Sequence, residues 1–156
     1  MTRKRHIGVT LGFVLSSSGE VNAAAVARLP KGEIISLIVD ASAIAVGLSS
    51  PQYVAQKIFT AAQVLREAGL GVIFCHVSTF NPAASPVKVR AAQRTLRDAM
   101  IEKNEGQPSW WKIYIAERYR PPLAAMLTTA YITEFWGTSP TDRHTARNAG
   151  ATYCSA

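Results

Sequence analysis

Residues 34–77 read IISLIVDASAIAVGLSSPQYVAQKIFTAAQVLREAGLGVIFCHV. The stretch opens with residues 34–39, a near-continuous apolar and β-branched run that is typical of a strand covered on both faces. Ser50 then predicts the start of a helix, and Gly69 predicts its end. A second apolar run, residues 70–77, follows at once. This order predicts a βαβ unit, in which a helix joins two parallel strands.

The segments before and after this unit continue the alternation of strands and helices. Alternating apolar residues predict a strand over 7–15, and a short helix follows over 21–29. Downstream, the pattern predicts helices over 87–103, 123–129 and 140–150 and strands over 111–115, 132–136 and 152–154. The sequence therefore predicts one three-layer α/β domain over 1–156, with a doubly wound, mostly parallel, Rossmann-like sheet. Residues 1–32 supply an extra strand and short helix at its N-terminus.

Composition limits the class of protein. A chain of 156 residues with 48% hydrophobic and 17% charged residues predicts a packed single domain rather than a disordered segment. No stretch approaches the about 18 apolar residues that a membrane span needs. Cys75 and Cys154 lie in apolar stretches without the spacing of metal ligands, which predicts buried thiols in a reducing, cytoplasmic location.

The charge balance predicts an anionic partner. Seventeen Lys and Arg against ten Asp and Glu give a formal net charge of +7. Arg90, Arg94 and Arg97 are spaced to fall along one side of the predicted helix 87–103, where phosphates could neutralise them. The alternative is that they form an ordinary solvated face.

Polar side chains cluster where the predicted strands end. Asp40 follows the first buried strand, Ser78 lies at the end of the next, and residues 137–142 join a later strand to a helix. In open α/β sheets, functional groups gather at this carboxyl edge. A carboxylate there can bind a metal or attack phosphorus. The alternative for Asp40 is that it accepts backbone N–H groups in the loop that follows.

Several of these segments resemble one family. Residues 136–151, WGTSPTDRHTARNAGA, resemble the fourth motif of haloacid-dehalogenase-like phosphohydrolases. Residues 119–122, YRPP, look like the segment that precedes a helix in the polynucleotide-phosphatase branch of that family. Asp40 within residues 39–43, VDASA, is similar to the nucleophile of the first motif. The resemblance extends over residues 34–156.

The resemblance implies a haloacid-dehalogenase-like fold and a set of site residues. Asp40 would be the nucleophile, and Asp40 and Asp142 would hold Mg²⁺ if the protein is active. Ser42 stands at the position of the general acid, and the second motif falls on Ser78 or His76. Otherwise no cofactor is implied.

This sequence also departs from the family pattern. Ser42 replaces the general acid, Pro121 replaces the lysine and Thr138 replaces one metal-binding acid, while Arg120 beside the proline could supply a charge. Phosphoryl transfer needs bound metal and a cation on the moving group. We therefore expect a binding or assembly module for nucleic acid or protein that has lost efficient phosphatase activity.

Two enzymatic alternatives stay open. Asp40 at the end of a buried strand also resembles the first aspartate of PIN-like nucleases, which cut RNA with metal held by clustered acids. Asp142 could be a second acid, and Asp98 and Glu134 are further candidates. The other alternative is a weak phosphatase of the haloacid-dehalogenase type that uses Asp40.

Overall fold

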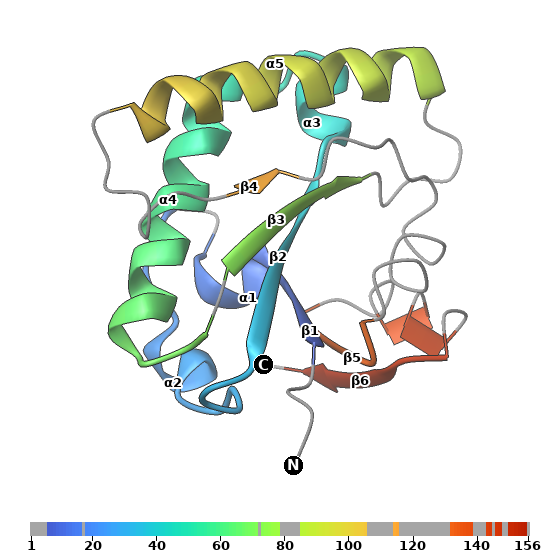
Figure 1. Ribbon diagram of the computed structural model, residues 1–156. Helices are drawn as coiled ribbons and strands as arrows, with labels where there is room; N and C mark the ends of the chain where they lie inside the picture. Colours follow the sequence, from blue (N-terminus) through green and yellow to red (C-terminus); the bar gives the residue numbers. More distant parts are fainter. Residues whose placement is uncertain are drawn as a thin grey trace.

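The computed structural model describes residues 6–16, 18–71, 73–78, 85–105, 114–115, 132–138, 143–144, 146–147 and 150–155. These residues contain a six-stranded sheet in the order β4-β3-β2-β1-β5-β6 (Figure 1). The strands are β1 His6–Thr10, β2 Ile34–Asp40, β3 Ile73–Ser78, β4 Tyr114–Ile115, β5 Glu134–Gly137 and β6 Thr152–Ser155. Every neighbouring pair is parallel. The predicted α/β fold with a parallel sheet is therefore confirmed.

The sheet is doubly wound around β1. From β1 the chain moves outward through β2 and β3 to β4, and it then returns to the other side of β1 for β5 and β6. Ile7 of β1 consequently pairs with Ile35 on one side and with Glu134 on the other. The N-terminal strand, which we predicted as an extra strand of the domain, therefore lies at the centre of the sheet.

One face of the sheet carries the main core. The helices are α1 Leu11–Val14, α2 Ala23–Val26, α3 Ser42–Ala45, α4 Pro51–Glu67 and α5 Pro86–Asn104. Leu37 of β2 packs in one buried cluster with Ile58 and Leu65 of α4 and Leu96 of α5. In Figure 1, α4 lies to the left of β2 and β3, while α5 crosses the top, above the ends of these strands. This arrangement places α5 beside the carboxyl edge.

The other face carries a smaller core. Side chains alternate along a strand, so Ile38 points away from the side of Leu37. Ile38 packs with Ile132, Phe135 and Ala146, all of them buried. Ala146 belongs to a short helical segment of which the structure describes residues 143–144 and 146–147. Helical residues thus lie on both faces of the sheet, as a three-layer fold requires.

The first predicted strand was too long. β1 ends at Thr10, and the next four residues are helical, so the prediction of one strand over 7–15 was wrong. The Thr10 hydroxyl accepts a hydrogen bond from the backbone N–H of Phe13 at 3.2 Å. This side-chain cap stabilises a helix start at the point where the alternating pattern continued.

Other boundaries also differ from the sequence prediction. The helix predicted over 21–29 shortens to α2, which Asn22 caps, and α3 was not predicted at all. α4 begins and ends where Ser50 and Gly69 predicted. The predicted helix 123–129, most of strand 111–115 and part of helix 140–150 lie outside the described residues.

Gly71 makes a close backbone approach that gives a stability prediction. Its N–H donates to the Glu33 carbonyl at 3.1 Å, and an added Cβ would lie 2.3 Å from the same oxygen. We expect Gly71→Ala to lower the free energy of unfolding by about 2–3 kcal/mol, because the backbone must move.

Gly19→Ala is the matched control, measured by urea unfolding. Gly19 has a φ of 87° but no atom within 4 Å of an added Cβ. It should lose only the about 1 kcal/mol that a left-handed conformation costs an alanine. Equal losses in the two variants would show that the contact with Glu33 is unimportant.

Candidate functional site

The carboxyl ends of the central strands meet at one edge of the sheet. Asp40 ends β2, Thr10 ends β1 and Gly137 ends β5. An added Cβ on Gly12 would lie 3.6 Å from the Thr138 hydroxyl oxygen, so the chain leaving β1 lies against the chain leaving β5. After β1 the chain continues on the face of the main core, and after β5 it continues on the other face. The point between two such strands is a topological switch point, and open α/β sheets bind ligands there.

A cavity of about 200 Å³ opens at this edge, between the ends of β1 and β2 and the first turns of α4. Its polar lining consists of Thr10, Asp40, Ser49, Tyr53 and Lys57. A carboxylate and an ammonium group therefore line the same small space, together with two hydroxyl groups and a phenol. The cavity has the mixed polar lining of a site for a small charged group.

Asp40 is held in place by the chain that follows it. Its Oδ1 accepts hydrogen bonds from the Ser42 backbone N–H at 2.9 Å and from the Ser42 hydroxyl at 2.6 Å. The interpretation of Asp40 as an acceptor for the following loop is thereby confirmed. The same contacts fix the orientation of a half-buried carboxylate that lines the cavity. Ser42 acts here as a hydrogen-bond donor that positions Asp40.

Tyr53 and Lys57 join this site from α4, and the sequence analysis did not predict them. Their spacing of four residues puts them on one side of the helix. The Lys57 Nζ lies 5.4 Å from the centroid of the Tyr53 ring, which is a cation–π distance. Tyr53 is 51% exposed, so its ring is accessible. The sequence signal that could have indicated them is an aromatic residue and a lysine four residues apart in the first turns of α4.

Of the predicted residues on β3, only Ser78 lies at this edge. Its backbone pairs in register with Asp40, and its side chain lies outside the described residues. His76 lies two residues earlier, on the face that carries the smaller core, where its ring centroid is 6.3 Å from that of His6. His6 Nε2 and the Ser36 hydroxyl are 2.5 Å apart. His6, Ser36 and His76 therefore form a polar cluster on this face of the sheet.

The three arginines of α5 form the predicted stripe. Arg90, Arg94 and Arg97 are all exposed, and we call them the basic stripe. The Gln93 side chain on the same helix donates from Nε2 to the Val77 carbonyl at 2.6 Å, which ties this half of α5 to the end of β3. α3, which follows β2, also contacts α5. The basic stripe therefore lies near the edge that holds the Asp40 cavity.

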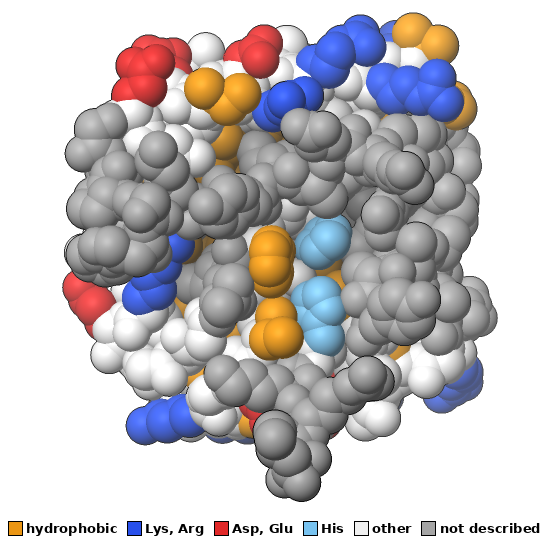
Figure 2. Space-filling model, viewed as in Figure 1, with side chains coloured by type: hydrophobic (Ala, Val, Ile, Leu, Met, Phe, Trp, Pro, Cys, Tyr) orange, Lys and Arg blue, Asp and Glu red, His pale blue; other side chains and the backbone are white. Residues whose placement is uncertain are grey.

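Charge is distributed unevenly along α5. Lys88 lies in the first turn, which has no acidic residue, and the last turn holds both Glu102 and Lys103. In Figure 2, basic side chains gather at one end of the top of the molecule and acidic side chains at the other. A helix dipole disfavours the lysine in the first turn and favours Lys103 in the last. Lys88 therefore does not stabilise the start of α5.

Three predicted features lie outside the described residues. They are Arg120, Asp142 and the helix start at 139–142. Within the described part of the chain, no group of three or more His, Cys, Asp and Glu side chains could hold a metal ion. Asp40 is therefore the carboxylate that the structure places in the cavity.

The prediction of buried thiols is confirmed for Cys75, whereas Cys154 is half-buried. No disulfide joins Cys75 and Cys154. Burial raises the pKa of the Cys75 thiol to about 12, which keeps it protonated at neutral pH. Cys75 is therefore an inert core residue.

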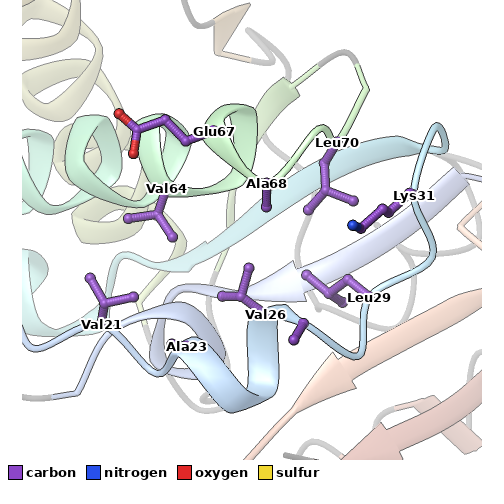
Figure 3. A pocket seen from close by; sticks show the side chains of 10 residues that line it. Val21, Ala23, Val26, Leu29, Lys31, Val64, Glu67, Ala68 and Leu70 are labelled. Atoms are coloured by element: carbon purple, nitrogen blue, oxygen red, sulfur yellow. The ribbon is translucent and has the colours of Figure 1, made fainter.

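A separate apolar groove of about 380 Å³ lies between α2 and the end of α4 (Figure 3). Val26, Val64 and Leu70 point into it, and Lys31 and Glu67 are its charged residues. Lys31 and Leu70 shortly precede β2 and β3, so the groove lies toward the amino ends of these strands. It is distinct from the carboxyl-edge cavity.

No protein-family model, curated protein or solved structure matches this chain. The resemblances to haloacid-dehalogenase-like phosphohydrolases and to PIN-like nucleases therefore stay predictions. In the described residues, no helix combines the length and the apolar character that crossing a membrane would require.

Proposed function

We propose that this protein binds single-stranded nucleic acid across the carboxyl edge of its sheet. The observation that carries the proposal is the basic stripe, three exposed arginines tied through Gln93 to the end of β3. Guanidinium groups bind phosphates through paired hydrogen bonds and release the counterions that surround a nucleic acid. The formal net charge of +7 supports the same partner.

The Asp40 cavity, at the same edge of the sheet, offers further contacts. Tyr53 offers an exposed ring on which a base can stack, and such stacking contributes about 1–3 kcal/mol per base. Lys57 places a positive charge against that ring and toward the cavity. A strand whose phosphates follow the basic stripe could place one base on Tyr53.

Fluorescence anisotropy with a labelled single-stranded oligoribonucleotide tests this function. We expect the logarithm of the binding constant to fall linearly with the logarithm of salt concentration, by about 0.7 per phosphate contact. Three contacts predict a slope of about −2. An oligomer of the same bases with an uncharged backbone is the control and should bind weakly. Binding that is absent at low salt, or that does not change with salt, would overturn the proposal.

Asp40 favours a second candidate function, which is metal-dependent cleavage of a phosphodiester. Mg²⁺ keeps several waters and takes one or two protein carboxylates together with substrate phosphates. Asp40 is an oriented carboxylate in a cavity at the carboxyl edge of the sheet, so it suits one such ligand position. A metal held there would activate water and neutralise charge on a phosphate. Lys57 would bind the same phosphate as a cation.

Thermal unfolding in a Mg²⁺ titration separates the two functions. With a dissociation constant of about 1 mM, about 10 mM Mg²⁺ stabilises the protein by about 1.4 kcal/mol. This corresponds to a rise in melting temperature of about 3–5 °C. Asp40→Asn should abolish the rise, because the amide keeps an acceptor for Ser42 but loses the charge.

The matched control for this prediction is Glu20→Gln. Glu20 is an exposed carboxylate between α1 and α2, so its loss should leave the Mg²⁺ response unchanged. A saturable rise that is lost only in Asp40→Asn, with RNA cleavage that needs Mg²⁺, would establish the enzyme. Equal responses in the wild type and Asp40→Asn would leave binding as the function.

A further inference from the structure

A second positively charged site lies at β6, the last strand of the sheet. A pocket of about 490 Å³ is lined by Arg143, Arg147, Gly150, Ala151, Tyr153 and Ser155. Among these described lining residues, the charged groups are the two guanidiniums, and there is no carboxylate. A pocket of this size can hold a small molecule.

The two arginines project from a short segment that is anchored on the sheet. Ala146 lies between them in sequence and is fully buried against Ile38 and Phe135. The Gly150 N–H donates to the Arg147 carbonyl at 3.1 Å, which closes the end of the segment. Their spacing of four residues brings both guanidiniums to one side. The side chains of Arg143 and Arg147 therefore lie on the same side of this segment.

Tyr153 fixes one of these guanidiniums. The Arg143 guanidinium carbon lies 5.4 Å from the centroid of the Tyr153 ring, a cation–π contact. The ring itself packs against Phe135, with the ring centroids 6.5 Å apart. Because Phe135 is fully buried, the Tyr153 ring under Arg143 is anchored on the core. Such preorganisation lowers the entropy that ligand binding costs.

Like charges four residues apart repel, and an anion shared by both relieves that repulsion. Planar guanidiniums match the oxygens of a phosphate through paired hydrogen bonds. We propose that this pocket binds a phosphomonoester dianion of nucleotide size. The inference does not depend on nucleic-acid binding by α5, because it uses none of the residues of the basic stripe or of the Asp40 cavity.

Isothermal titration calorimetry with adenosine monophosphate tests this site in the full chain. We expect saturable binding that weakens at least tenfold in Arg143→Gln and in Arg147→Gln. Arg94→Gln removes a charge from the basic stripe and should leave this affinity unchanged. Saturable binding that persists in the double variant, or no binding by the wild type, would overturn the proposal.

The pH dependence gives a test that needs no variant. A phosphomonoester loses its second charge below about pH 6, so its affinity should fall between pH 7 and pH 5. Inorganic sulfate keeps both charges over this range and should show no such fall. Equal pH profiles for the two anions would contradict recognition of the phosphate dianion.

Oligonucleotides distinguish the two sources of a phosphomonoester. A 5′-phosphorylated oligoribonucleotide that binds more tightly than both its 5′-hydroxyl form and adenosine monophosphate would identify the end of a nucleic acid as the ligand. Equal affinity for the two oligonucleotides, with tight binding of the mononucleotide, would identify a free nucleotide. Either result supports a phosphate site, because adenosine monophosphate binds in both.

Discussion

Replacing Arg90, Arg94 and Arg97 together with glutamine is expected to weaken binding of single-stranded RNA by about 10- to 100-fold. An exposed ion pair contributes up to about 1 kcal/mol, so three lost contacts multiply to this range. The slope of the logarithm of the binding constant against the logarithm of salt concentration should become less negative by about 2, because each phosphate contact on a single strand contributes about 0.7. Anisotropy titrations at several salt concentrations measure both quantities.

Single substitutions provide the matched control for the stripe. Arg94→Gln and Lys31→Gln remove one positive charge each from an exposed side chain. Arg94 belongs to the stripe, whereas Lys31 lines the apolar groove toward the amino ends of the strands. Arg94→Gln should weaken binding several-fold, and Lys31→Gln should have little effect. Equal losses would mean that net charge, rather than the stripe, attracts RNA.

Leu96→Ala is expected to lower the free energy of unfolding by about 2–5 kcal/mol. Leu96 is fully buried and belongs to the cluster that holds α5 against the sheet and α4. Truncation removes apolar contacts and leaves a cavity that the surrounding core fills only in part. Since a domain has only about 5–15 kcal/mol of stability, this loss is a large fraction of the total.

Ile101→Ala on the same helix is the control for this prediction. Ile101 is 51% exposed, so its truncation should cost well under 1 kcal/mol. Urea unfolding followed by circular dichroism measures both variants. A small loss for Leu96→Ala would indicate that α5 is not docked as the structure describes, and the location of the basic stripe would then need revision.

The sequence predicted the elements whose signals are local. Residues 34–39 form a strand because a β-branched run suits a sheet covered on both faces, and Ser50 and Gly69 bound α4 through capping. The strand predicted over 7–15 failed because the Thr10 hydroxyl caps a helix there. The alternation of apolar residues favours a strand there, whereas the Thr10 cap favours a helix, and the structure has the helix.

The strand order could not be predicted from such signals. Nothing local in the sequence specifies that β1 pairs with both β2 and β5, because pairing depends on contacts between distant segments. In this order β1 lies between β2, which Asp40 ends, and β5, which Thr138 follows.

The candidate site was predicted in part. The rule that ligands bind at the carboxyl edge located Asp40 correctly, and helical spacing predicted the exposed stripe on α5. Tyr53 and Lys57 were missed because attention went to strand ends rather than to the first turns of the next helix. Arg143 was missed because its partner, Tyr153, lies on a different element.

The central position of β1 also affects how the chain folds. Pairing of Ile7 with Glu134 closes a loop that contains nearly the whole chain, and such long-range contacts form slowly. During synthesis β1 can pair with β2 early, while its other side waits for β5 to leave the ribosome. An unpaired apolar strand edge is a template for association with another chain. The nascent protein is therefore most prone to aggregate in the interval before β5 arrives.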